Sequence, residues 1–153
     1  MTSKRTKIIV GTIIAVFFAF IIYREICAIF IVYFESQAEE LMDEGEYEKA
    51  LDKLFLSRKF LIKDEIVEIN SAYFGECYFH LGMYEEALKH FQDALVDCDS
   101  ENESIYYSSI GFTYEKLGKY DKAMENYLYS LDAGYDAPDL ILERIDALES
   151  SYE

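Results

Sequence analysis

The chain opens with a long run of apolar positions that lacks the polar face of a surface helix. Ile8 to Tyr23 are sixteen apolar or weakly polar residues, which as a helix would span about 24 Å at ~1.5 Å per residue. Because a bilayer core is about 30 Å thick, a span over residues 8–24 needs help from its flanks. Arg24 can supply it by extending its side chain toward the head groups. The pattern therefore predicts one transmembrane helix.

Charged and aromatic residues mark where this span would end. We assign Tyr23, Arg24 and Glu25 to the membrane boundary and residues 25–34 to an interfacial lead-in to the next helix. Residues 1–7 are basic, so the positive-inside rule places the N-terminus in the cytoplasm and the rest of the chain across the membrane. A cleaved signal peptide is the alternative, but the sequence near Ala28 lacks a small-residue cleavage site. We expect an uncleaved signal anchor.

Beyond the span, apolar positions recur at helical spacing and repeat along the chain. Phe74, Tyr78 and Leu81 stand at i, i+4 and i+7, and a second apolar stripe follows Gly82. The segments "SAYFGECYFHLGMYEEALKHFQDAL" and "YSSIGFTYEKLGKYDKAMENYLYSL" align without gaps, 36 residues apart, and "EGEYEKALDKLF" is a weaker upstream copy. Each copy predicts two helices joined by a tight turn at a glycine.

The shared positions resemble the tetratricopeptide repeat, whose pattern is W-x2-L-G-x2-Y followed by A-x3-F. Their counterparts, which we assign to repeat packing, are Gly75, Tyr78, Ala87 and Phe91 in one copy and Gly111, Tyr114, Ala123 and Tyr127 in the next. The closing proline of the pattern is absent. The resemblance implies an all-α, right-handed α-solenoid over residues 35–153. About three helical hairpins (32–65, 68–101 and 104–137) would be followed by a C-terminal capping helix at 139–151.

Counting back from Gly45 makes the first repeat begin near Val32, only seven residues after Glu25. The apolar residues between them then suit a lead-in to that repeat better than a bilayer-buried stretch. We therefore expect one near-continuous helix from Ile8 to about Glu44, which would hold the repeats close to the membrane.

The resemblance also implies a concave groove lined by the first helix of each hairpin. The face opposite the core-facing Phe74, counted at 100° per residue, carries large apolar side chains in two consecutive repeats. We therefore expect a partner-binding strip made of Ile69, Ala72, Glu76, Phe79, His80, Ile105, Ser108, Phe112, Glu115 and Lys116. The alternative is that some of these side chains pack between neighbouring first helices.

Charge restricts the partner. The chain has 30 acidic and 14 basic residues, a formal net charge of −16, and most of the acids follow the anchor. Such a surface repels phosphate backbones, so we expect no nucleic-acid binding. A protein or peptide with apolar anchors and basic flanks is favoured, in a groove whose rim is acidic. Family members that clamp a C-terminal carboxylate use lysine, arginine and asparagine on this face. This chain has Ala72, Glu76, Ser108 and Phe112 there, so we do not expect it to bind a terminal carboxylate.

The sequence carries no pattern typical of a metal, cofactor or catalytic site. Its three cysteines have no CxxC spacing, and its two histidines have no HExxH or cysteine partner. No cofactor and no enzymatic activity are expected. A hydrolase that uses Glu76, His80 and Glu115 is a third possibility that rests on their proximity alone. "NES" at Asn102 matches a glycosylation acceptor, which matters only if the domain is lumenal.

The resemblance and the anchor together favour a single-pass, membrane-anchored adaptor or scaffold with its repeat domain on the non-cytoplasmic side. The alternative is an N-anchored import or assembly receptor with the domain in the cytosol. Free Cys77 and Cys98 and the acidic surface suit that reducing compartment, whereas the charge bias across the anchor opposes it. Gly11, Ala15 and Ala19 form one small-residue face through which the anchor could form a homodimer, and a monomeric anchor is the other possibility.

Overall fold

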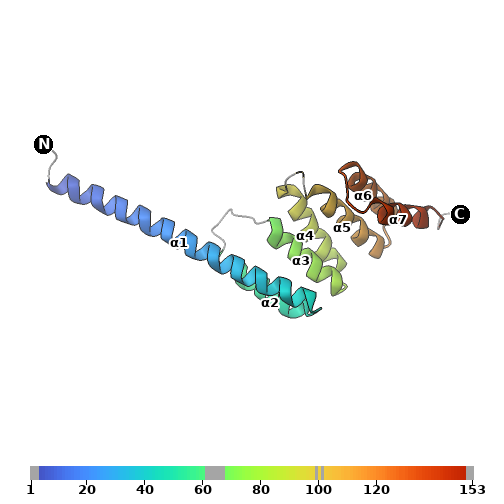
Figure 1. The fold of residues 1–153 in the computed structure, drawn as a ribbon, viewed down its shortest axis with the longest axis horizontal. Helices are drawn as coiled ribbons and strands as arrows, with labels where there is room; N and C mark the ends of the chain where they lie inside the picture. The colour runs from blue at the N-terminus through green and yellow to red at the C-terminus, as the bar shows by residue number, and fades with distance from the viewer. Residues whose placement is uncertain (1–3, 61–67, 99, 101, 151–153) are drawn as a thin grey trace.

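The computed structural model describes residues 4–60, 68–98, 100 and 102–150, apart from the side chains of residues 6, 7, 68, 69 and 97. Every regular element within these ranges is an α-helix. Figure 1 shows a long N-terminal rod that continues into a stack of shorter helices, with the two chain ends far apart. The fold is the expected all-α, solenoid-like stack of hairpins, and one long apolar helix leads into it.

Helix α1 (Lys4–Asp43) runs without interruption from the apolar segment into the first hairpin. This confirms the near-continuous helix that the repeat spacing predicts. Its 40 residues make a rod about 60 Å long at ~1.5 Å per residue. The charged pair Arg24 and Glu25 therefore lies inside the helix rather than at one of its ends.

Three helical hairpins and a last helix form the stack. The C-terminal part of α1 pairs with α2 (Tyr47–Arg58), α3 (Glu68–His80) with α4 (Tyr84–Asp97), and α5 (Glu103–Lys116) with α6 (Tyr120–Asp132), while α7 (Pro138–Ser150) packs on α6. The three hairpin turns contain Gly45, Gly82 and Gly118, with φ of 77°, 76° and 69°. At each turn the glycine N–H donates to the carbonyl three residues earlier, and the next N–H donates to the carbonyl five residues earlier. A side chain is strained at such φ, so the repeated glycine gives three equivalent turns.

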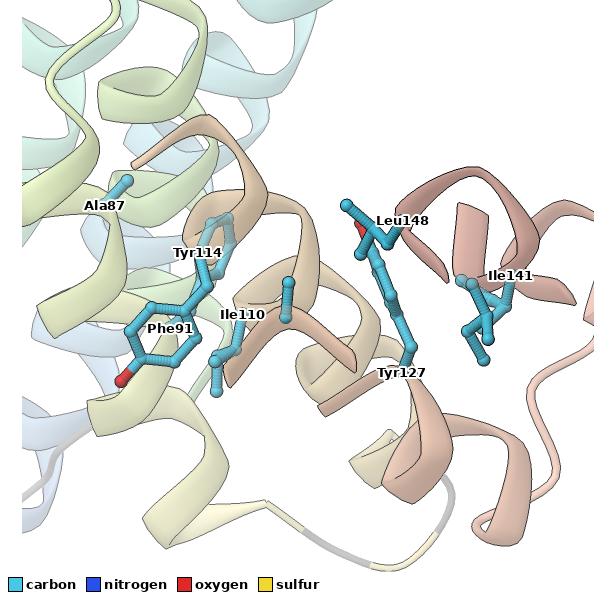
Figure 2. Close-up of a cluster of buried hydrophobic side chains, with 9 residues drawn as sticks. Ala87, Phe91, Ile110, Tyr114, Tyr127, Ile141 and Leu148 are labelled. Atoms are coloured by element: carbon cyan, nitrogen blue, oxygen red, sulfur yellow. The ribbon is translucent and has the colours of Figure 1, made fainter. Parts of the chain in front are cut away.

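The buried side chains form two clusters that follow the order of the hairpins. The first joins α1, α2 and α3 and consists of Ala38, Met42, Ala50, Leu51, Leu54, Phe74 and Cys77. The second joins α4, α5, α6 and α7 (Figure 2) and consists of Ala87, Phe91, Ile110, Tyr114, Ala123, Tyr127, Ile141, Ile145 and Leu148. Half-buried Tyr78 packs against both clusters, so the two cores are continuous through it.

Gly75 and Gly111 lie where the two helices of a hairpin approach closely. A Cβ atom at Gly75 would stand 2.7 Å from the ring of Phe91, and one at Gly111 would stand 2.6 Å from the ring of Tyr127. Both rings are buried, so they have little room to move aside. These glycines are therefore required by the aromatic residue that faces them, and each pair is 16 residues apart in its own repeat.

A polar network joins α1 and α2 to the start of α3. Asn70, which is 2% exposed, donates through Nδ2 to Glu35 Oε1 at 2.9 Å and to Ser57 Oγ at 2.8 Å. Its Oδ1 accepts from Arg58 Nε at 3.0 Å, and the Arg58 guanidinium lies 3.9 Å from the centre of the Phe74 ring. Since the network spans three helices, it fixes the first hairpin to the second.

Candidate functional site

A hollow of about 500 Å³ opens between α3, α5 and α7, with α4 behind it. Its apolar surface comes from three aromatic rings, and its polar surface comes from side chains of both charges. The lining residues are Glu76, Phe79, His80, Phe91, Ser109, Phe112, Lys116 and Arg144. A hollow of this size, apolar inside with a few polar groups around it, is typical of a ligand or peptide site.

Five of the ten residues expected in the partner-binding strip line this hollow, namely Glu76, Phe79, His80, Phe112 and Lys116. Both phenylalanines are half-buried and packed against the second core cluster. Phe112 meets the Tyr127 ring edge-on at 5.3 Å, and Phe79 meets the Tyr84 ring at 5.6 Å. Each ring therefore has one side in the core and contributes another to the hollow.

The other expected strip residues lie elsewhere. Ser108 is 2% exposed and its hydroxyl donates to the Ile105 carbonyl at 2.8 Å, while the neighbouring Ser109 lines the hollow. Ile105 is exposed outside the lining, and Ala72 is half-buried. The Ile69 side chain lies outside the described residues. Ser108 is therefore buried within the stack and is not open to a partner.

Three lining residues were missed by sequence reasoning: Phe91, Ser109 and Arg144. Phe91 was assigned to packing alone. Arg144 lies in the segment 139–151 that we assign to a C-terminal capping helix, and α7 lines the hollow together with α3 and α5. Its residues Ile141, Ile145 and Leu148 are buried, whereas Arg144 is exposed beside them. Arg144 lies beyond the two aligned copies of the repeat, so no sequence signal placed it on the hollow.

The α3 side of the hollow is acidic. Glu76 lies near Glu39 and Asp43 of α1, both of which are exposed. Partial loss of hydration raises the pKa of the Glu76 carboxyl. His80 lowers that pKa, and the negative charges of Asp43 and Glu39 raise it. The His80 ring stacks face to face on Tyr47 of α2 with ring centres 4.3 Å apart, which fixes it at this end of the site.

The opposite side of the hollow is basic. Lys116 of α5 and Arg144 of α7 both line it, and both side chains are exposed. Arg144 Nη1 donates to Glu115 Oε1 at 3.2 Å, and the other oxygen of Glu115 accepts from the buried Tyr127 hydroxyl at 2.6 Å. Burial and the Glu115 carboxylate raise the pKa of Tyr127, so its hydroxyl remains a donor. Glu115 therefore positions Arg144 from the core side instead of lining the hollow itself.

This arrangement separates the three residues of the hydrolase hypothesis. Glu76 and His80 stand on α3, whereas both oxygens of Glu115 are engaged by Tyr127 and Arg144. Ser109 donates its hydroxyl to the Ile105 carbonyl at 3.0 Å. Among the described residues, no group of three or more His, Cys, Asp or Glu side chains could hold a metal ion. The geometry suits the binding of an apolar side chain with charged neighbours.

A second exposed apolar surface lies on α1. Every described side chain from Ile8 to Ile26 is exposed, including Tyr23, Arg24 and Glu25, and Cys27 is the first buried one. Further along, the Phe30 ring stacks on Phe60 with centres 4.8 Å apart, so the end of the first hairpin contacts the expected lead-in, although Phe30 itself remains exposed. Within the described residues, α1 is the one helix whose length and apolar composition would allow it to cross a membrane.

Comparison with known proteins agrees with the helical geometry. Residues 67–133 match the sequence model of the tetratricopeptide repeat family, which corresponds to α3 through α6. A search of curated proteins finds no match. The matched region contains both Gly75/Phe91 and Gly111/Tyr127 pairs, while the first hairpin and α7 lie outside it. Members of this family generally serve as protein-interaction scaffolds rather than catalysts. The match covers less than half of the chain. Together with the stacked hairpins it shows that α3 to α6 are similar to tetratricopeptide repeats, in a fold that a long apolar helix leads into.

Proposed function

We propose that this chain is a membrane-anchored adaptor that binds a partner protein in the hollow between α3, α5 and α7. The observation that carries the proposal is the hollow itself, in which three aromatic rings are surrounded by charged side chains. Rings that line an open hollow leave apolar surface in contact with water. Binding of a partner that covers them is favoured by about 25 cal/mol of free energy for each Å² of apolar surface removed from water.

The partner is a protein or peptide segment with apolar anchor residues and basic flanks. The repeat domain is strongly acidic, so its field attracts a basic segment from solution, and binding should weaken as salt is raised. The apolar rings then hold the anchor residue. Nucleic acid is disfavoured by the same charge.

The α1 segment up to Ile26 serves as the membrane anchor in this proposal. Its exposed stretch of 19 residues is about 28 Å long at ~1.5 Å per residue, close to the ~30 Å core of a bilayer. Lys4 and Arg5 precede it, which favours a cytoplasmic N-terminus and a repeat domain across the membrane. An import or assembly receptor with a cytosolic domain is the alternative, and it is supported by the absence of disulfides among the described cysteines.

The groove is tested with the double variant Phe79→Ala and Phe112→Ala in the full chain. We expect it to lose at least about tenfold in recovery of partners by affinity capture, because both rings border the same hollow. Bound proteins are quantified by mass spectrometry against the parent chain. Thermal unfolding followed by circular dichroism establishes that the variant is folded at the capture temperature.

The matched control is Val96→Ala with Leu128→Ala, which removes two apolar side chains that are 82% and 54% exposed on α4 and α6. This control should retain the partners of the parent chain. Equal recovery by a folded groove variant and the control would overturn the proposed binding site.

The orientation is tested by labelling Cys98 in intact cells with a membrane-impermeant maleimide. Cys98 is half-buried, whereas Cys27 and Cys77 are 3% and 0% exposed. Burial also raises the pKa of the Cys77 thiol to about 12, so it supplies little reactive thiolate. We expect labelling that disappears in the Cys98→Ser variant. Labelling by permeant reagents alone would place the domain in the cytosol and favour the receptor alternative.

A further inference from the structure

The hollow between α3, α5 and α7 has opposite charges at its two ends. Glu76 lies at the α3 end, and Glu39 and Asp43 of α1 lie near enough to raise its pKa. Lys116 and Arg144 lie at the α5 and α7 end, and the rings of Phe79, Phe91 and Phe112 line the same hollow. In a domain whose charge is otherwise strongly acidic, two cations on one hollow require an explanation.

The position of Arg144 is fixed by two contacts that do not depend on a ligand. Glu115 holds the guanidinium by one oxygen, and Tyr127 holds Glu115 by the other. The guanidinium carbon also lies 5.9 Å from the centre of the Phe112 ring, which itself lines the hollow. A cation held in this way costs little further ordering when a ligand arrives.

Lys116 adds to this cationic end. It occupies the last turn of α5, where the exposed carbonyl ends of the helix favour a positive charge. It lines the hollow, whereas its neighbour Glu115 is turned to Tyr127 and Arg144. The two ends of the site thus attract opposite charges, separated by an apolar centre.

We infer that the hollow selects a partner segment of mixed charge, with a basic residue on one side of its apolar anchor and an acidic residue on the other. The basic residue lies toward Glu76, and the acidic side chain lies toward Lys116 and Arg144. This inference rests on the proposed binding function and refines it, because it replaces one of the two basic flanks of the partner with an acidic one. It makes Lys116 and Arg144 the specificity-determining residues, and it gives the bound segment a single direction along the groove.

Four peptides test this inference on the full chain in nanodiscs of zwitterionic lipid at low salt. All are acetylated and amidated and share a central Leu-Phe pair, so that only the flanks differ. The flanks are Lys-Lys before and Glu-Glu after the centre, the reverse order, Lys-Lys on both sides, and Glu-Glu on both sides. Isothermal titration calorimetry measures each dissociation constant.

We expect one of the two mixed peptides to bind at least about fivefold more tightly than the all-lysine peptide, and the other mixed peptide to bind more weakly. Fivefold corresponds to one exposed charge pair of about 1 kcal/mol. The variant Lys116→Gln with Arg144→Gln should abolish this preference. Its control, Lys89→Gln with Lys119→Gln, changes the net charge equally at exposed positions outside the hollow and should keep it.

The possible failures are distinguishable. Tightest binding by the all-lysine peptide, or a preference that survives Lys116→Gln with Arg144→Gln, would overturn the mixed-charge inference and leave the binding site standing. Absence of binding by all four peptides would count against the proposed site itself. If the double variant melts below the assay temperature, Lys116→Gln alone, which leaves the Arg144 and Glu115 pair intact, should still reduce the preference.

Discussion

Replacing Tyr127 with alanine should lower the free energy of unfolding of the repeat domain by about 3–5 kcal/mol. The Tyr127 side chain is 0% exposed, and its ring lies under Gly111 and against Phe112 in the second core cluster. Its removal leaves a cavity between α5, α6 and α7 (Figure 2) and frees Glu115 from its core-side partner. Urea unfolding of the full chain in detergent, followed by far-UV circular dichroism, measures the loss.

The control for this prediction is Tyr127→Phe, which keeps the ring and removes the 2.6 Å hydrogen bond to Glu115. A bond to a charged acceptor contributes about 1.5–3 kcal/mol, so this loss should be clearly smaller than that of the alanine variant. Equal losses for the two variants would show that the hydrogen bond, and not the packing of the ring beneath Gly111, carries the stability.

Replacing Asn70 with alanine should lower the free energy of unfolding by about 3 kcal/mol, measured in the same way. The buried amide satisfies Arg58 Nε and Glu35 Oε1 and donates to the buried Ser57 hydroxyl. Each buried polar group that loses its partner costs about 1–3 kcal/mol. Since these groups belong to α1, α2 and α3, the variant should loosen the first hairpin in particular.

The loss caused by Asn70→Ala should also depend on pH. Burial raises the pKa of Glu35 above the usual 4.5, and the hydrogen bond from Asn70 lowers it. Without that bond the Glu35 pKa rises further. A carboxyl whose pKa is higher in the folded than in the unfolded state binds its proton more tightly in the folded state. The free energy of unfolding therefore rises as pH falls from 7 through that pKa, and it rises more in the variant because its Glu35 pKa is higher. The difference between variant and parent should therefore shrink toward pH 5.

The matched control is Asn126→Ala. The Asn126 amide donates only locally, to the Lys122 carbonyl at 2.8 Å. Its removal should change the free energy of unfolding by less than about 0.5 kcal/mol. If Asn70→Ala behaved like Asn126→Ala at pH 7, the network would have no part in joining the first hairpin to the second.

The repeat architecture could be predicted from sequence because its signals are local. The glycines at positions 45, 82 and 118 predict the hairpin turns, because such turns need a positive φ. The 36-residue alignment then locates the helices on either side of each turn. The uninterrupted α1 followed from counting residues back from Gly45. None of these inferences required knowledge of which side chains meet across the stack.

The candidate site could be predicted only in part because it depends on such meetings. Counting at 100° per residue placed Phe79 and Phe112 on the face that lines the hollow. It could not distinguish Ser108, which is buried, from Ser109, which lines the hollow. Arg144 was missed because it lies on α7, beyond the two aligned copies of the repeat. The Asn70 network was invisible because its members are far apart in sequence and no pattern relates them.

The unbroken α1 affects which partners can bind in the hollow most readily. From Cys27 to Asp43 the helix continues for 17 residues, about 25 Å at ~1.5 Å per residue. The charges of Glu39 and Asp43 near its end raise the pKa of Glu76, which lines the hollow. Under the proposed membrane anchoring, α1 joins the anchor to the hollow without a break, so the site is held within a narrow range of distances from the lipid. A partner anchored in the same bilayer by a short stem would search that layer in two dimensions, at a local concentration far above its bulk value. A longer or more flexible stem would lower this effective concentration.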